Sequence, residues 1–285
     1  MKWFPMLLLS SYIGLMTCCF HASRWQTEFE RVKCFRNFSQ SYQDCTLQSL
    51  FDRMHLGSTN QYYVEFGFHL NDVLGTAKFG QPRKRHPRPG EIPPYGGNTE
   101  LLRRQGWTGL RMDGHEHINK DPVIYKEFIT PQNVAHLFQK YKVPIEPDYV
   151  SIDIDSCDLW VFLALTDAYR PRVISIEYNS NYAFEESKTN VCVRPDDAKE
   201  PFFTSKGHIG DGASFMAIHK AARRRGYEVV WVDAYLDVFL VRADLLCDFP
   251  KVNRFRSMTV LVLHEDRVTL HFTTSAKEKW VVDYV

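Results

Sequence analysis

The chain has 285 residues, of which 44% are hydrophobic and 24% are charged. This length and composition fit one large domain with a packed core and exclude global disorder. The formal net charge is +1, from 35 basic and 34 acidic side chains. Proteins that bind nucleic acids through charge need a strong basic excess, so no nucleic-acid partner is predicted.

The N-terminus carries an apolar run. Lys2 precedes positions 3–20, which contain no charged residue. One cation before about 15 apolar residues is typical of a secretory signal peptide. We therefore expect residues 1–22 to be a signal that is removed after Ala22 or after Cys19. The alternative is a short, uncleaved type II anchor, and only in that case is a membrane partner expected. Both interpretations place the protein in the secretory pathway, either secreted or in the lumen of the endoplasmic reticulum or Golgi.

The cysteines and one tripeptide fit an oxidising compartment. Beyond the expected targeting segment, the cysteines are Cys34, Cys45, Cys157, Cys192 and Cys247. Five is an odd number, so at least one stays free or pairs between chains. Cys34 and Cys45 are close enough in the sequence to form a local disulfide. Asn37-Phe38-Ser39 is an N-glycosylation acceptor sequence, and we expect a glycan on Asn37.

The rest of the chain alternates between strand-like and helix-like segments after a polar, partly helical lead-in over 23–60. The expected strands are 62–68, 109–113, 124–129, 149–155 and 171–178. The expected helices are 98–104, 131–141, 158–168 and 212–225. This alternation predicts βαβ units and a mainly parallel sheet that is covered by helices on both faces.

The last strands of the domain break the parallel pattern. A short turn separates 227–233 from 238–242, so this pair is expected to be antiparallel and to close the sheet. In the tail, 259–264 and 268–272 are expected to form a β-hairpin. The predicted division is thus an α/β domain over 61–250 and a C-terminal β extension over 251–285.

Four of the expected parallel strands end in acidic residues. These are Glu65, Asp113, Asp153 with Asp155, and Glu177. In open α/β sheets, ligands bind at the carboxyl ends of the strands. Carboxylates gathered at one edge are costly unless a cation, sugar hydroxyls or bound donors satisfy them. The pattern therefore indicates a ligand site at this edge.

The acidic residues suggest specific chemistry. Asp113 ends the second strand, where a carboxylate can accept both hydroxyls of a ribose. Asp153 and Asp155 are two residues apart, so on a continuing strand their side chains project to the same side. Such a pair can hold a divalent metal, with Glu177 as a third ligand, or provide a base for a substrate hydroxyl. Asn179 is a further catalytic candidate.

The order of these motifs resembles the FkbM-like branch of class I S-adenosylmethionine-dependent methyltransferases. The resemblance covers about residues 60–246, and its most specific combination is Asn-Thr, Gly-Trp-x-Gly and Ser-Ile-Asp-Ile-Asp. The stretches that carry it are YYVEFGF (62–68), GGNTELLRRQGWTGLRMDG (96–114), EPDYVSIDIDSCDLWVFLAL (146–165), PRVISIEYN (171–179) and 212–245.

The resemblance implies a Rossmann-like methyltransferase fold that uses S-adenosylmethionine to O-methylate a small-molecule or glycan acceptor. It also implies roles for individual residues. Glu65 and Gly67 belong to the first cofactor motif, Gly97 and Asn98 lie near the carboxylate of the cofactor, Asp113 and Gly114 form the ribose site, Phe128 borders the adenine, and Asp153 and Asp155 lie beside the methyl-transfer position.

Two alternatives remain open, and a departure from the family pattern motivates the first of them. The first motif usually has further glycines, but here 68–71 is Phe-His-Leu-Asn, and a basic, proline-rich insertion precedes Gly96-Gly97. The first alternative is therefore a non-catalytic secreted binding module on an eroded methyltransferase fold. The second is a Golgi glycosyltransferase in which Asp153-Ile154-Asp155 holds a metal and a nucleotide diphosphate.

Overall fold

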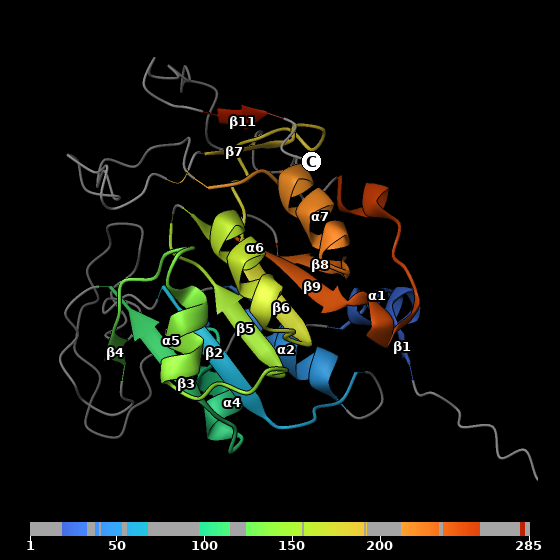
Figure 1. The fold of residues 1–285 in the computed structure, drawn as a ribbon. Helices are drawn as coiled ribbons and strands as arrows, with labels where there is room; N and C mark the ends of the chain where they lie inside the picture. Colours follow the sequence, from blue (N-terminus) through green and yellow to red (C-terminus); the bar gives the residue numbers. More distant parts are fainter. Residues whose placement is uncertain are drawn as a thin grey trace, which may run out of the picture.

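A computed structural model describes residues 19–32, 38–39, 41–52, 56–67, 97–114, 124–155, 157–190, 192, 212–233, 236–256 and 280–282. Within these residues the chain forms a mixed α/β structure around a mostly parallel seven-stranded sheet (Figure 1). The expected α/β class is confirmed, and the arrangement is compatible with a Rossmann-like fold. Among the described residues, no helix combines the length and apolarity needed to cross a membrane.

The sheet has the strand order β4-β3-β2-β5-β6-β9-β8. Its strands are β2 (Tyr62–Phe66), β3 (Thr108–Asp113), β4 (Tyr125–Lys126), β5 (Tyr149–Ile152), β6 (Val173–Glu177), β8 (Tyr227–Asp233) and β9 (Asp237–Arg242). The first five strands in this order run parallel. Strand β9 is antiparallel to both β6 and β8, because only a short turn joins it to β8. The expected antiparallel pair is therefore confirmed, but β9 lies inside the sheet and β8 forms the edge.

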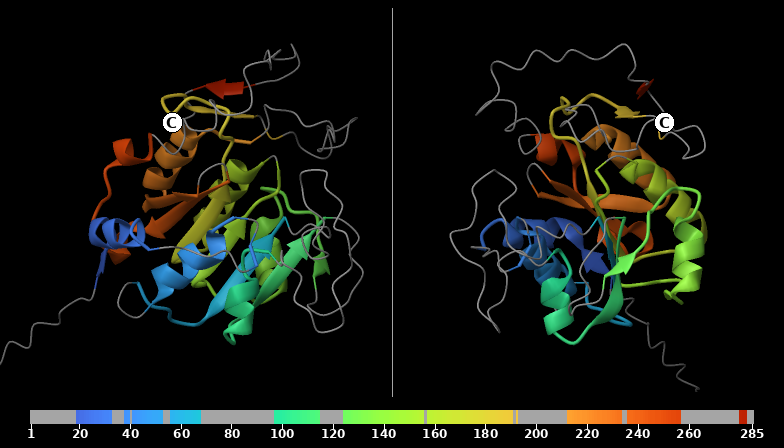
Figure 2. Two further views of the ribbon diagram at one scale, coloured as in Figure 1. Left: turned by 180° about the vertical axis from the view of Figure 1, so that it is seen from behind. Right: turned by 90° about the vertical axis from the view of Figure 1, so that its left-hand side faces the viewer.

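Helices cover both faces of the sheet. In the right-hand view of Figure 2 the sheet is the layer between the two groups of helices. One face packs against α5 (Val134–Lys140), α6 (Asp158–Ala168) and α7 (Phe215–Arg224). The other face packs against α1 (Ala22–Phe29), α2 (Gln43–Phe51) and α4 (Glu100–Arg104). Successive side chains of a strand point to opposite faces. Accordingly, Val64 and Phe66 enter the first core, and Tyr63 enters the second.

Four strands are shorter than the sequence predicts. β2 ends at Phe66 instead of at position 68, and β6 covers Val173–Glu177 instead of 171–178. The differences at β5 and β4 are larger. β5 stops at Ile152 instead of reaching Asp155, whose φ of +60° is a left-handed conformation that a strand cannot accommodate. β4 is limited to Tyr125–Lys126 instead of 124–129. Among the described residues its ladder partner is β3, which ends at Asp113, so the ladder between them stops at Lys126.

Several short elements are not apparent from the sequence. Within the expected loop 179–210, β7 (Lys188–Asn190) pairs antiparallel with β11 (Trp280–Val282). Near the other end, β1 (Phe20–His21) pairs parallel with β10 (Leu246–Asp248). Two 3₁₀ helices, Ala243–Leu245 and Val252–Phe255, flank β10. The expected hairpin over 259–272 lies outside the described residues.

The fold begins inside the segment that the sequence predicts to be a targeting signal. β1 and the first residue of α1 lie within residues 1–22, and Cys19 forms a disulfide with Cys247. Trp25 of α1 stacks on Phe29 at 5.0 Å between ring centroids and meets Trp231 of β8 edge-on at 6.0 Å. These contacts make α1 part of the second core.

Hydrogen bonds connect the N-terminal lead-in segment to the hairpin formed by β8 and β9. The Ser41 hydroxyl and the Tyr42 backbone N–H donate to the two carboxylate oxygens of Asp233, each at 3.0 Å. The Gln43 side chain donates to Asp237 Oδ2 at 3.0 Å. Burial raises the pKa of Asp233 to about 6, although the two hydrogen bonds oppose the rise. The start of α2 thus covers the sheet beside the turn that joins β8 to β9.

We predict that Asp233 makes stability depend on pH. Its folded pKa of about 6 lies above the ordinary value of 3.8, so the folded state holds the proton more tightly than the unfolded state. The stabilisation is complete below about pH 4 and is lost as the pH rises through 6. Since each pKa unit is worth about 1.4 kcal/mol, the loss is about 3 kcal/mol.

Urea unfolding of the wild type and of Asp233→Asn between pH 4 and 7 measures this effect. The unfolding free energy of the wild type, relative to that of the variant, should fall by about 3 kcal/mol across the interval. Other titrating groups contribute equally to both proteins and cancel in the difference. A constant difference across this pH range would contradict the prediction.

Candidate functional site

The carboxyl edge of the sheet is organised around a close backbone approach at Gly67. Gly67 follows β2 with a φ of +84°, and a Cβ built on it would lie 1.1 Å from the carbonyl oxygen of Asp153. The turn after β2 therefore lies directly against the turn after β5. Only glycine combines the left-handed conformation with the absence of a side chain, so this residue sets how the two turns meet.

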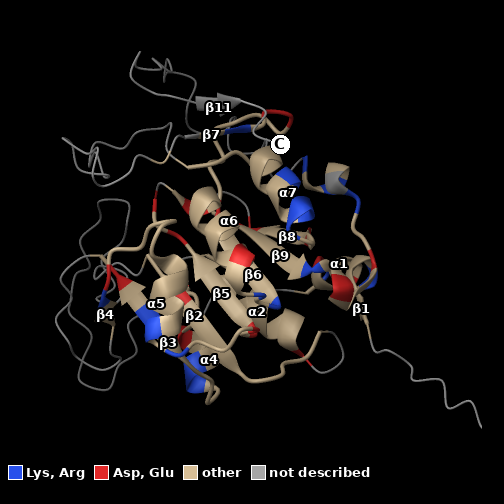
Figure 3. Cartoon of the chain, in the orientation of Figure 1, with Lys and Arg blue, Asp and Glu red and all other residues tan. Residues whose placement is uncertain are grey.

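Three carboxylates come together beside this approach. Asp153 and Asp155 follow β5, and Glu177 ends β6. One oxygen from each lies within 4.8 Å of the others, and none of the three side chains is fully buried. Figure 3 shows acidic residues on the segments at the carboxyl edge of the sheet, and Lys and Arg on helices α4 and α7. We call Asp153, Asp155 and Glu177 the acidic cluster.

A fourth acid, Asp158, supports the turn that carries the cluster. It is the first residue of α6, and its Oδ1 accepts the Ile154 backbone N–H at 2.7 Å. Burial, reinforced by the charge of Asp153, raises the pKa of Asp158 to about 8. At neutral pH this carboxyl is therefore mainly protonated, which limits the negative charge at the site.

A disulfide connects the turn after β5 to a segment further along the chain. Cys157, buried just before α6, is bonded to Cys192 with 5.4 Å between the Cα atoms. Cys192 lies just after β7, so the bond ties the turn after β5 to the expected polar loop. Cys45 is also disulfide-bonded, and its expected partner Cys34 lies outside the described residues.

Glu65 holds the start of α4 and does not point to an open site. Its carboxylate accepts the backbone N–H of Asn98 at 2.6 Å, the backbone N–H of Thr99 at 3.1 Å, and the Thr99 hydroxyl. Arg111 lies 3.8 Å away as a buried ionic partner. Burial raises the pKa of Glu65, although Arg111 and the hydrogen bonds oppose the rise. Glu65 thus positions the segment beginning at Gly97, whose φ is +86°.

A buried chain of polar groups links this segment to the middle of the sheet. The Asn98 side chain donates to Ser151 Oγ at 3.0 Å, and Ser175 Oγ donates to the same oxygen at 3.2 Å. Ser175 Oγ also lies 2.7 Å from the Tyr149 hydroxyl. Ser151 and Ser175 are register partners on β5 and β6. The backbone N–H and the side-chain amide of Asn98 are therefore both bonded to the protein.

The structure brings the predicted ribose and adenine residues together. Asp113 ends β3, and its carbonyl accepts the Glu127 N–H at 2.8 Å. A Cβ on Gly114 would lie 3.0 Å from the Phe128 ring. The Phe128 side chain is 41% exposed, whereas Asp113 is 4% exposed. A ribose carboxylate is expected to face a cleft, but Asp113 is buried at the end of β3, whereas Phe128, beside Gly114, is exposed.

Asn179, the remaining catalytic candidate, lies two residues after the end of β6. The Asn179 amide oxygen accepts from the backbone and side-chain nitrogens of Asn181 at 2.9 and 2.8 Å, which makes it a turn-forming residue. Asn37, Gly96 and the basic insertion lie outside the described residues. The glycan on Asn37 therefore stays a prediction.

A polar hollow of about 660 Å³ lies at the opposite edge of the sheet. Its walls come from the end of α2 and from the segments that enter β2 and β3, including Asp52, Asn60 and Trp107. This edge carries the amino ends of the parallel strands, whereas ligands of open α/β sheets bind at the carboxyl ends. We therefore do not assign the candidate chemistry to this hollow.

Some residues of the site could not be identified from motifs. Ser151 and Ser175 lie within the motif stretches, which imply no role for them, although a polar residue in an otherwise apolar strand signals a buried hydrogen bond. The sequence predicts Asp158 only as the first residue of a helix. Its role depends on the backbone of Ile154, which bends back because β5 ends early.

We predict that Gly67→Ala abolishes folding or destabilises the domain by more than about 4 kcal/mol, because the new methyl group would overlap the Asp153 carbonyl. Gly106→Ala is the matched control. Gly106 has a similar φ of +89°, but no atom lies within 4 Å of the position that its new methyl group would take. That change should cost only the left-handed strain of about 1–2 kcal/mol. Equal losses for the two variants in urea unfolding would disprove the close approach.

Neither a protein-family model nor a curated protein matches this chain. The resemblance to FkbM-like methyltransferases therefore rests on the sequence motifs alone.

Proposed function

We propose that the protein is an S-adenosylmethionine-dependent O-methyltransferase of the secretory pathway, acting on a small-molecule or glycan hydroxyl. The observation that carries the proposal is the arrangement of the carboxyl edge. Asp113 and Phe128 lie at β3, the acidic cluster lies at β5 and β6, and Gly67 at the end of β2 separates the two groups. This is the order in which a nucleoside end and a reacting end would lie along one ligand.

The strand arrangement supports the finer fold assignment within this proposal. The parallel strands follow the order 3-2-1-4-5 when numbered from β2, as in a Rossmann sheet. The antiparallel β9 then enters between β6 and the edge strand β8. An otherwise parallel sheet with an antiparallel strand at this end is what the methyltransferase resemblance implies.

The β3 side of the edge suits the nucleoside part of the cofactor. Asp113 offers carboxylate oxygens where a ribose carboxylate is expected, and the exposed Phe128 ring offers an apolar surface for an adenine. The methionine part has fewer partners, because the backbone N–H and one side-chain N–H of Asn98 are already bonded to Glu65 and Ser151. This last observation favours the alternative of a non-catalytic module, so cofactor binding is the decisive test.

The β5 side of the edge suits proton removal. When bound, S-adenosylmethionine supplies an electrophilic methyl group, which an acceptor oxygen attacks as the bond from methyl to sulfur breaks. A carboxylate of the acidic cluster takes the proton of the acceptor hydroxyl, and Asp158 and Cys157 hold its turn in place. Three carboxylates within 4.8 Å also suit a hard divalent cation, which would lower the pKa of the acceptor hydroxyl.

We predict that Asp113→Asn and Asp113→Ala weaken binding of S-adenosylhomocysteine by about 1.5–3 kcal/mol, the usual contribution of a hydrogen bond to a charged group. Isothermal titration calorimetry measures the affinity, and circular dichroism checks the fold, which matters because Asp113 is buried. Asp52→Asn, at the opposite edge, is the control and should bind like the wild type. Unchanged affinity in a folded Asp113→Asn protein would refute the ribose assignment, and no binding by the wild type would favour the non-catalytic alternative.

We predict that Asp153→Asn and Asp155→Asn slow methyl transfer by about 10²–10⁴-fold, the usual contribution of a general base. Affinity for S-adenosylhomocysteine should stay within a few-fold of the wild type. Transfer of a labelled methyl group to extracts of secretory glycans and lipids provides the assay. Full activity of both variants would make the cluster structural.

The same two variants also test the role of a metal. If a cation is required, a chelator should abolish turnover of the wild type, and both variants should bind Mn²⁺ more weakly in a calorimetric titration. Tight binding of a nucleotide sugar with Mn²⁺, without binding of S-adenosylhomocysteine, would instead favour the glycosyltransferase alternative.

A further inference from the structure

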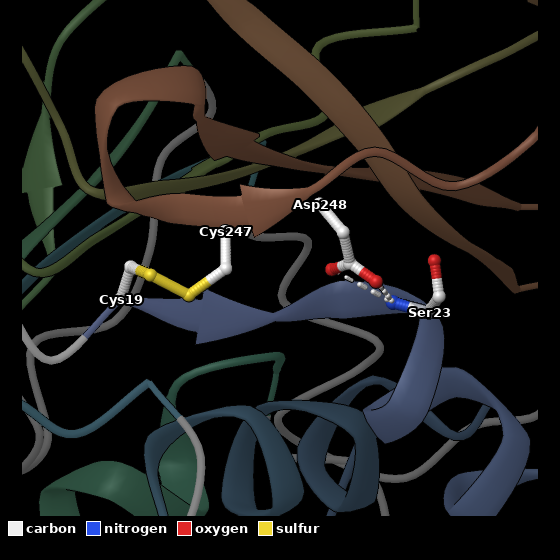
Figure 4. Close-up of a disulfide and its surroundings, with 4 residues drawn as sticks. All are labelled: Cys19, Ser23, Cys247 and Asp248. Atoms are coloured by element: carbon white, nitrogen blue, oxygen red, sulfur yellow. Dashed lines mark hydrogen bonds between the residues drawn. A yellow bond between two sulfur atoms is a disulfide. The ribbon is translucent and has the colours of Figure 1, made fainter.

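The boundary between the N-terminal apolar run and the folded domain lies at Cys19. Cys19 is bonded to Cys247 with 5.2 Å between the Cα atoms, a distance typical of disulfides. Figure 4 shows the bond crossing from the start of β1 to β10, next to the hydrogen bonds between Ser23 and Asp248. The bond closes a loop with a sequence separation of 228 residues.

The residues just after Cys19 are also integrated into the fold. Phe20 is 2% exposed and Ala22 is fully buried. Phe20 pairs with Leu246 in the ladder between β1 and β10, and its ring lies 5.8 Å from that of Trp25. The Ser23 backbone N–H lies 3.3 Å from both carboxylate oxygens of Asp248. Removal of this segment would expose apolar surface on the second core and leave a cysteine unpaired.

This packing argues against both of the processing sites that the sequence predicts. A cut after Ala22 or after Cys19 would remove Cys19 from the mature chain and leave Cys247 without its partner. A cut after Ala22 would also remove the strand β1. Thr17 and Cys18 are the small residues nearest to the fold on its amino side, and small residues are required just before a signal cleavage site.

The same boundary also decides between a signal and an anchor. Because residues from Cys19 onward belong to the fold, positions 3–18 are the only apolar residues of the run left for a membrane. Even as a continuous helix they would reach only about 24 Å, at about 1.5 Å per residue. The hydrocarbon core of a bilayer is about 30 Å thick. In addition, no spacer separates this run from the domain.

We propose that the leader is removed amino-terminal to Cys19, so that the mature chain begins at Cys18 or Cys19 and is fastened at its start by the Cys19–Cys247 disulfide. Hydrolysis of one peptide bond consumes one water and leaves a carboxyl on the leader and an amine on the mature chain. The two thiols then lose two electrons and two protons to a disulfide-carrying oxidase of the secretory lumen, whose own disulfide is reduced. The inference rests on the proposed secretory entry and not on methyl transfer.

The test is the N-terminus of the full chain, expressed with a C-terminal tag in a eukaryotic secretory host. The purified protein is sequenced from its N-terminus, and its peptides are mapped by mass spectrometry without reduction. A start at Cys18 or Cys19, with a linked peptide containing Cys19 and Cys247, supports the proposal. A lumenal product that starts at Phe20 or Ser23, or that keeps its leader, overturns this inference alone. A cytosolic product that keeps Met1 overturns the secretory proposal as well.

Three variants test the disulfide separately. Cys19→Ser and Cys247→Ser should each expose one thiol to alkylation and lower Tm by roughly 5–15 °C, as expected for loss of a native disulfide in a domain of this size. The double variant should be no less stable than either single variant. Cys18→Ser is the matched control and should leave Tm unchanged. A lowered Tm for Cys18→Ser, with none for Cys19→Ser, would overturn the assigned pairing.

Discussion

The backbone approach between Gly67 and Asp153 is the constraint on which the rest of the carboxyl edge depends. Because no side chain fits between Gly67 and Asp153, the turns after β2 and β5 lie in direct backbone contact. The turn after β5 then leaves its strand early, and Asp155 adopts a left-handed conformation. As a result, Asp153 and Asp155 lie close to Glu177 without the regular geometry of a strand.

Three of the buried acids, Glu65, Asp158 and Asp233, are stabilised by the fold in different ways. Glu65 is surrounded by hydrogen-bond donors and Arg111, and thereby organises the segment before α4. Asp158 instead has a pKa raised to about 8, so it serves mainly as a neutral group. Asp233 lies between these extremes, with a pKa of about 6 and two donors from the lead-in. A fold accommodates a buried carboxyl group in two general ways: it pairs the carboxylate with donors or cations, or it raises the pKa so that the group is protonated.

The regular elements could be predicted because their signals are local. Helix α6 and strand β8 have the predicted bounds, since each is a long apolar segment with a clear start and end. The pairings of β1 with β10 and of β7 with β11 could not be predicted. They join short segments that are distant in the sequence, and strands of two or three residues have no periodicity to detect.

The candidate site was predictable to a similar extent. The rule that strand ends converge was enough to place Asp153, Asp155 and Glu177 together. The rule could not show that the Glu65 carboxylate accepts hydrogen bonds from Asn98 and Thr99. These bonds depend on where the chain re-enters the fold after residues 68–96. The same limit applies to Asp113, whose burial at the end of β3 could not be read from its place in the strand.

The Cys157–Cys192 disulfide has a consequence for how this protein could diversify. It joins the carboxylate-bearing turn to the surface segment that follows β6. Surface loops are normally the parts of a fold that can change in length and sequence at little cost. Here an insertion or deletion between β6 and Cys192 would displace the turn that carries Asp155, because the disulfide connects the two segments. A mutation that alters the ligand specificity of the loop would therefore also move the carboxylates of the turn. Specificity and the geometry of the reactive groups could not evolve independently.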